Sequence, residues 1–148
     1  CIRDRICSPL GRVKSTAKIA LLEATYLSEI TYDDRLKEHG FGTWEGLNLE
    51  EIEERFPGMQ DQREKDCWNF KLPEGESYAV LESRLTSFLQ SIDKSQDIIL
   101  FCHEMVSKTL RKILLGLTEN QTINLTHDQF SFFVIDNKKV HQYNCNPH

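Results

Sequence analysis

The sequence predicts an α/β fold, a mostly parallel sheet flanked by helices on both faces, with an antiparallel hairpin at the C-terminal end. Strand-like segments alternate with segments whose apolar residues follow helical spacing, as in βαβ units. Residues 98–102 form a continuous apolar run, which is typical of a central strand covered on both faces. With 148 residues, 39% of them hydrophobic, and no internal repeat, the chain predicts a single domain over residues 1–148.

The expected elements alternate along the chain, and Ser77 is a plausible N-cap for the third helix. The first half predicts a strand at 1–7, a helix marked by Val13, Ala17, Ala20, Leu21, Ala24 and Leu27, a weak strand at 30–36, a glycine-rich loop at 38–46, and a short acidic helix marked by Leu49, Ile52 and Phe56. The second half predicts a polar stretch at 59–73, a helix marked by Leu81, Leu85, Phe88, Leu89 and Ile92, the central strand, a helix marked by Val106, Leu110, Ile113, Leu114 and Leu117, and a hairpin at 130–143.

Composition excludes several classes of partner. The net charge of −5, without a dense run of Lys or Arg, argues against nucleic-acid binding. No apolar run is long enough to cross a bilayer and the N-terminus does not resemble a signal peptide, so we expect a cytoplasmic protein without a membrane partner. The five cysteines, which are widely spaced and include no C-x-x-C, predict free thiols rather than disulfides or a zinc site.

Three polar residues fall where strands of such a sheet end, the edge at which α/β sheets bind ligands. His103 follows the central strand and opens a helix, where free backbone N–H groups favour an anion. Arg12 begins the helix after the first strand, and its guanidinium could bind phosphate oxygens in pairs. Glu38 follows the weak strand, and a carboxyl beside phosphate has a raised pKa that suits a proton donor.

Each residue also has an ordinary structural explanation. His103 could simply end its strand, and Glu38 could be a loop carboxylate. Its neighbour His39 is a second candidate, although a polar surface position is the more ordinary interpretation. A lone arginine on a first helical turn is more commonly solvated, so spacing alone favours that interpretation for Arg12. A nucleophilic Cys102 with His103 as its base is geometrically poor, because adjacent strand residues point to opposite faces.

Four segments carry a further signal in their order along the chain: SPLGRVKSTA at 8–17, LKEHGFGTWEG at 36–46, GES at 75–77, and ILFCH at 99–103 followed by Val106. They resemble motifs of the histidine phosphatase superfamily, which includes cofactor-dependent phosphoglycerate mutases, fructose bisphosphatases and α-ribazole phosphatases. The resemblance implies the phosphoglycerate mutase-like fold and attack by a histidine on a phosphomonoester, giving a phosphohistidine. It also implies a small phosphorylated metabolite as the partner and no metal or other cofactor.

The resemblance gives individual residues a role. Arg12 would bind phosphate, Glu38 would be the general acid, and His103 would be the second catalytic histidine, which also contacts the phosphoryl group. Glu76 and Ser77 would lie on the substrate side.

Two features depart from the family pattern. Glu104 and Met105 stand where glycines usually follow the second histidine, which places a carboxylate near the expected phosphate. The R-H-G motif with the nucleophilic histidine lies upstream of S-P-L in the family, so we expect the domain to be incomplete at its N-terminus by roughly 50 residues, the size of a strand, loop and helix. The remaining histidines lie in other contexts: His39, His127, His141 and His148.

The sequence therefore predicts a phosphomonoester phosphatase whose nucleophile lies outside this chain. A phosphoglycerate mutase is one alternative, and the compact length favours the phosphatase. A non-catalytic pseudoenzyme or a truncated fragment that binds a phospho-ligand or a protein is the other. The sequence leaves open the substrate and the oligomeric state, with a dimer among the options.

Overall fold

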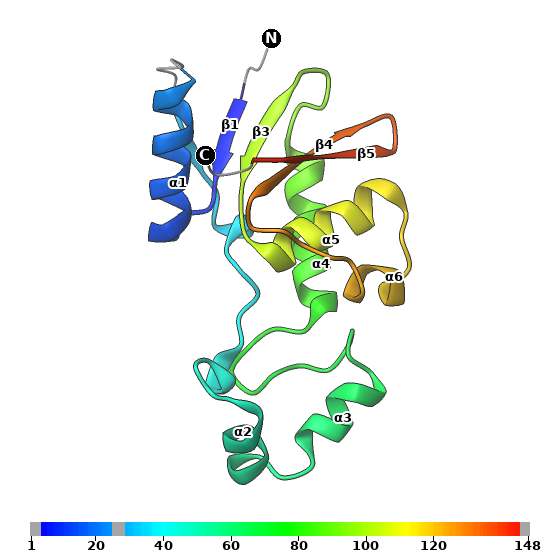
Figure 1. The fold of residues 1–148 in the computed structure, drawn as a ribbon. Coiled ribbons are helices and arrows are strands. Elements are labelled where there is room, and N and C mark those ends of the chain that lie inside the picture. Colours follow the sequence, from blue (N-terminus) through cyan, green and yellow to red (C-terminus); the bar gives the residue numbers. More distant parts are fainter. Residues whose placement is uncertain (1–3, 25–28, 146–148) are drawn as a thin grey trace.

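Short strands build the upper part of the molecule in Figure 1, where β1 and β3 are each followed by an α-helix. The computed structural model describes residues 4–24 and 29–145. Its strands are β1 (Asp4–Cys7), β2 (Thr31–Tyr32), β3 (Ile98–Phe101), β4 (Ser131–Asp136) and β5 (Lys139–Asn144). Its α-helices are α1 (Gly11–Glu23), α2 (Leu49–Arg55), α3 (Met59–Lys65), α4 (Tyr78–Ser91), α5 (Glu104–Leu115) and α6 (Glu119–Ile123), and short 3-10 turns cover Asp34–Leu36 and Gly42–Trp44.

The main sheet has three parallel strands in the order β2-β1-β3. Its side chains alternate between two apolar clusters, because successive residues of a strand point to opposite faces. Ile6 and Leu100 pack with the apolar stripes of α4 and α5, whereas Cys7 and Phe101 pack with Val13 of α1. Helices therefore cover both faces, and the predicted α/β class with a parallel sheet and a C-terminal antiparallel hairpin is confirmed.

Within the described residues, β3 is an edge strand, so the prediction that it lies at the centre of the sheet is wrong for this part of the protein. It pairs with β1 alone, and its four residues are only partly buried. The hairpin β4–β5 forms a sheet of its own beside β3 (Figure 1). A continuous apolar run predicts cover on both faces of a strand but does not predict a hydrogen-bonded neighbour at both edges.

Other differences have local causes. The weak strand at 30–36 shrinks to β2, because the Asp33 carboxylate accepts a hydrogen bond from the Arg35 N–H at 2.8 Å and starts a 3-10 turn. Helix α3 lies in the polar stretch at 59–73, for which the sequence predicted no helix. None of its residues is buried, so no apolar stripe marks it. In α1 the buried stripe ends at Leu21, and Ala20 is exposed. The predictions for Cys1, Leu27 and His148 lie outside the described residues.

Two further expectations can be compared with the described residues. The cysteines that can be described are free, namely Cys7, Cys67, Cys102 and Cys145. Among the described helices, none combines the length and the apolar character needed to span a bilayer.

Two loop segments cross below the sheet and join α2 and α3 to the rest of the molecule (Figure 1). The Glu76 N–H donates to the Gly40 carbonyl at 2.9 Å, and the Thr43 N–H donates to the Pro73 carbonyl at 3.0 Å. Gly42 has a φ of +56°, and a Cβ there would lie 2.1 Å from the Pro73 carbonyl oxygen. Only glycine fits at this position, which explains structurally why the second residue of the F-G-x-W-E-G segment is glycine.

We predict that Gly42→Ala lowers the free energy of unfolding by about 3 kcal/mol, because it adds a backbone clash to the cost of positive φ. Gly46→Ala is the matched control, since Gly46 also has positive φ, +79°, but its Cβ would meet nothing within 4 Å. The control should cost about 1 kcal/mol. Urea unfolding measures both, and equal losses would show that the crossing is not a close contact.

Candidate active site

His103 lies at the N-cap of α5, directly after β3, and is 6% exposed. Its Nε2 lies 2.8 Å from the Ser8 Oγ, and its Nδ1 lies 3.0 Å from an Arg12 Nη2. A guanidinium can only donate, so Nδ1 accepts and Nε2 carries the proton that Ser8 accepts. Burial, with smaller effects of the Arg12 and Arg84 charges, lowers the pKa of His103 to about 4. The imidazole is therefore neutral at pH 7.

Glu38 joins this pair from the loop after β2. Its Oε1 accepts a hydrogen bond from the His39 N–H at 3.0 Å. Burial raises the pKa of Glu38, while hydrogen bonds from the N–H groups of His39, Met105 and Val106 and the charge of Arg12 act against the rise. The carboxyl thus lies at the N-terminus of α5, and its raised pKa keeps more of it protonated, as a proton donor needs.

The structure brings Arg12, Glu38 and His103 together from three segments that follow β1, β2 and β3. Parallel strands share one carboxyl edge, so the order of the strands alone places these segments side by side. In Figure 1 this edge faces downward, toward the part of the molecule formed by α2 and α3. The arrangement combines a guanidinium, a neutral imidazole whose N–H donates to Ser8, and a carboxyl group, which together can bind an anion and supply a proton.

His39 is buried, and the expectation that it is a surface residue is wrong. Its ring is stacked on Tyr78 with centroids 4.8 Å apart and meets Phe41 edge-on at 5.1 Å. It is 4% exposed, and burial lowers its pKa. A polar residue in a loop rich in glycine gives no sign of an aromatic neighbour that lies about 40 residues further along the chain.

Glu76 and Ser77, expected on the substrate side, have partners within the protein. The Glu76 carboxylate accepts from the Arg84 Nε and Nη2, both at 2.9 Å, and from the Gly40 N–H at 3.2 Å. Ser77 caps α4 by accepting from the Val80 N–H at 3.3 Å. Glu76 therefore holds the loop that carries Glu38, Ser77 starts α4, and a contact of either residue with substrate remains a prediction.

Glu104, which the sequence places near the expected phosphate, pairs with Lys108 one helical turn further along α5. The carboxylate lies 2.7 Å from the Lys108 Nζ, and the Glu104 side chain is half exposed. This ion pair, with small contributions from other nearby bases, lowers the pKa of Glu104. The negative charge next to His103 is therefore offset by a lysine.

Sequence reasoning missed two residues that organise the site. Ser8 holds the His103 ring, and Arg84 donates to the carbonyls of Lys37 and Glu38 at 2.8 and 3.2 Å as well as to Glu76. Ser8 stands in the quoted S-P-L segment, which was the available signal. Arg84 is one arginine on an amphipathic helix, and such a residue is ordinarily solvated, so nothing in the sequence distinguished it.

Comparison with known proteins decides the family. The protein-family model described as "Histidine phosphatase superfamily (branch 1)" matches residues 2–143 of this chain. The chain belongs to the histidine phosphatase superfamily. The resemblance predicted from the four segments is thereby confirmed.

Relatives within the superfamily are similar over part of their length. The chain is 32% identical over 86 residues to a 6-phosphofructo-2-kinase/fructose-2,6-bisphosphatase of Gallus gallus, covering 58% of this chain and 18% of that protein. It is 31% identical over 100 residues to the protein of the same name in Caenorhabditis elegans, covering 68% and 21%. The chain spans about a fifth of the length of these curated relatives.

Solved structures show the same fold. The α-ribazole phosphatase of Shigella flexneri superposes with a TM-score of 0.78 at 22% identity, over 99% of this chain and 74% of that one. A mycobacterial glucosyl-3-phosphoglycerate phosphatase, solved with VO3, superposes with a TM-score of 0.63 at 22% identity, over 84% and 64%. These histidine phosphatase neighbours support the predicted phosphoglycerate mutase-like fold.

We predict that His103 in the free protein titrates near pH 4, well below its ordinary 6.5. Between these two pH values the unfolded chain binds more protons than the folded one, so this group makes the protein less stable as pH falls from 6.5 toward 4. Arg12→Met should move the titration upward, because it removes a neighbouring positive charge. Ring-proton NMR measures the pKa, with exposed Arg55→Met as the control. A wild-type titration at 6.5 would contradict the prediction.

Proposed function

We propose that this chain provides the phosphate-binding and proton-donating part of a phosphomonoester phosphatase that works through a phosphohistidine. The nucleophilic histidine would lie on a segment outside this sequence. The observation that carries the proposal is the meeting of Arg12, His103 and Glu38 at the N-terminus of α5. Membership of the histidine phosphatase superfamily supports the same reaction class.

Phosphate would bind through positive charge and N–H donors. Arg12 is exposed at the first turn of α1, so its guanidinium can reach two phosphate oxygens at once. The Nε2–H of His103 would turn from Ser8 to a phosphoryl oxygen, because a charged acceptor makes the stronger hydrogen bond. Both groups stabilise the negative charge on the equatorial oxygens during transfer.

The reaction would run in two balanced steps. A histidine nitrogen attacks phosphorus while the bond from phosphorus to the leaving oxygen breaks, and Glu38 gives its proton to that oxygen. Water then attacks the phosphohistidine, its proton returns to the Glu38 carboxylate, and the phosphorus–nitrogen bond breaks to release phosphate. Burial of Glu38 raises its pKa, which suits a group that donates and then accepts a proton.

A strand that carries the nucleophile would fit at the edge of β3 that no described strand pairs with. His103 directly follows β3, so a parallel strand paired there would also end beside His103. The partly buried apolar residues of β3 and the separate hairpin both leave surface that such a strand would cover. Pairing would satisfy the free N–H and C=O groups of the edge.

The substrate class would be a small phosphorylated metabolite. The relatives and neighbours named above are described as phosphatases of fructose 2,6-bisphosphate, α-ribazole phosphate and glucosyl-3-phosphoglycerate, which favours hydrolysis over mutase activity. The ion pair of Glu104 with Lys108 offsets the carboxylate that would otherwise repel phosphate.

We predict that Glu38→Gln in the natural protein slows hydrolysis of an alkyl phosphate by roughly 10²–10⁴, the usual contribution of general acid–base catalysis. The rate of phosphoryl transfer from p-nitrophenyl phosphate to the enzyme should fall less, because the leaving nitrophenolate needs little protonation. An initial burst of nitrophenol should therefore appear. Arg12→Ala should reduce turnover of both substrates, whereas exposed Arg55→Ala should leave it unchanged.

Acid-labile and base-stable labelling of a histidine with radioactive substrate completes this test. A labelled phosphohistidine supports the phosphatase. No label and no turnover, with phosphate still raising the melting temperature, would replace the proposal with a non-catalytic phospho-ligand binder.

A further inference from the structure

Among residues 4–24 and 29–145, Arg111 is a buried cation without a matching anion. It is 5% exposed, and its Nη2 has no hydrogen-bond partner. Its Nε makes one long contact, 3.4 Å to the Ser107 carbonyl. Burial lowers the pKa of Arg111. An unpaired guanidinium in such a place is strongly unfavourable, so its surroundings in the natural protein should supply an acceptor.

The nearby charges do not supply one. Glu104 is engaged by Lys108, and the ion pairs found among the described residues do not include Arg111. The Nδ1 of His127 also lacks a partner, and burial lowers the pKa of this histidine. Both side chains contact the Phe133 ring, with the Arg111 Cζ 4.1 Å and the His127 centroid 5.7 Å from its centre. Two side chains that each have a buried nitrogen without a hydrogen-bond partner therefore adjoin one aromatic ring.

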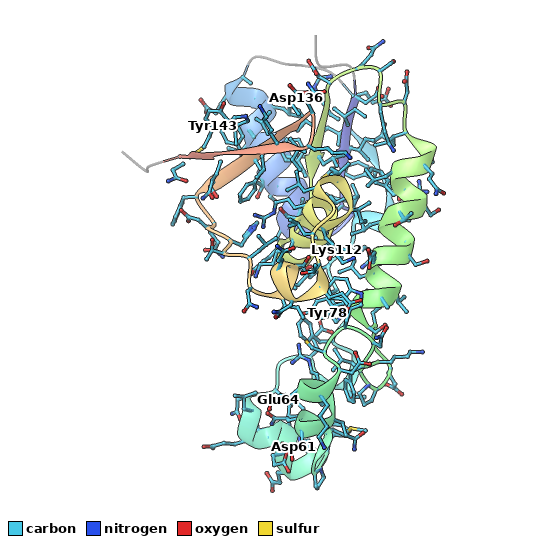
Figure 2. All side chains as sticks on the ribbon, turned by 90° about the vertical axis from the view of Figure 1, so that its right-hand side faces the viewer. Asp61, Glu64, Tyr78, Lys112, Asp136 and Tyr143 are labelled. Carbon is cyan, nitrogen blue, oxygen red and sulfur yellow. The ribbon has the colours of Figure 1, made fainter. Side chains whose placement is uncertain are left out.

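The position of Arg111 on α5 indicates where the acceptor would come from. Lys112, labelled in Figure 2, pairs with Glu82 of α4 at 2.6 Å, so the cation facing α4 is already neutralised. Arg111 precedes it by one residue and lies against Phe133 of β4. Its charge also acts on the thiol of Cys102, directly after β3. Arg111 thus lies against the hairpin and acts on the residue that directly follows β3.

We propose that Arg111 forms an ion pair with an aspartate or glutamate on the segment that fills the open edge of β3. This inference rests on the proposed function, which places the nucleophile-bearing segment at the same edge. The backbone of such a strand would form hydrogen bonds with β3 in the plane of the sheet. Every second side chain of the strand would point out of that plane, toward α5. A side chain on that face can therefore reach Arg111, and a carboxylate is the acceptor that also balances its charge.

The test is the thermal stability of the natural protein with Arg111→Met, which keeps the length of the side chain and removes the charge. At about pH 7 the variant should melt roughly 10 °C lower, because a carboxylate is left buried without its partner. The exposed Arg55→Met is the matched control and should shift melting by about 1–2 °C at most.

Lowering the pH distinguishes a carboxylate from a neutral acceptor. In the Arg111→Met variant the unpaired carboxylate takes up a proton at higher pH than it does beside Arg111. The difference in melting temperature between the variant and the wild type should therefore be smaller at a pH of about 4.5 than at a pH of about 7. Arg111 interacts electrostatically with Glu104, His127 and Cys102, while Lys108 and Asp128 act on Glu104 and His127. Making both proteins in a His127→Asn background removes the histidine of this group, whose pKa burial lowers from its ordinary 6.5.

Each outcome decides a separate point. The ion pair is overturned if the melting temperature of Arg111→Met equals or exceeds that of the wild type, or if the variant loses the same melting temperature at both pH values. Amide exchange of residues 98–101 in the natural protein tests the placement independently. Slow amide exchange at β3, combined with no effect of Arg111→Met on melting, would reject the ion pair but keep the added strand. Fast exchange at β3 would reject both the added strand and the ion pair. The phosphohistidine assay tests the proposed reaction independently of either result.

Discussion

The site depends on the parallel pairing of β1 with β3. This pairing continues past the end of β1, where the Ser8 N–H donates to the Phe101 carbonyl at 2.8 Å. It brings Ser8 and His103, which are 95 residues apart in the sequence, into direct hydrogen-bond contact. Arg12 follows on the first turn of α1, and β2 on the other side of β1 delivers the loop with Glu38. A change of register by one residue would turn these groups toward the opposite face.

Positive charge and burial act in opposite directions at this edge. Burial favours the neutral forms of both His103 and Glu38, and Arg12 favours neutral His103 but ionised Glu38. The N–H groups at the start of α5 also favour the ionised carboxylate. In the absence of an anion, the arginine and the imidazole therefore satisfy each other. A bound phosphate would compete for both, since it offers each a charged acceptor.

The sequence predicted the elements with strong periodicity and the three site residues that stand directly after strands. Helices α4 and α5 and the hairpin follow their apolar patterns, and Ser77 caps α4 as expected. Burial of His39, the bonds of Arg84 and the edge position of β3 depend on partners far along the chain or on strand neighbours. Local patterns do not encode such partners, which is also why α3, with no buried residue, was missed. The roles of Arg12, Glu38 and His103 stay predictions until the assays are done.

The loop crossing at Gly42 and Pro73 divides the chain into parts with different tolerance of change. Its hydrogen bonds fix both ends of the excursion that contains α2 and α3, while the residues that carry the proposed chemistry lie outside that excursion. Lengthening a closed loop adds little entropy cost, because the cost grows only with the logarithm of its length. Insertions or exchanges between these two anchors can therefore diversify the surface opposite Glu38 during evolution without rebuilding the proton-donating edge of the sheet.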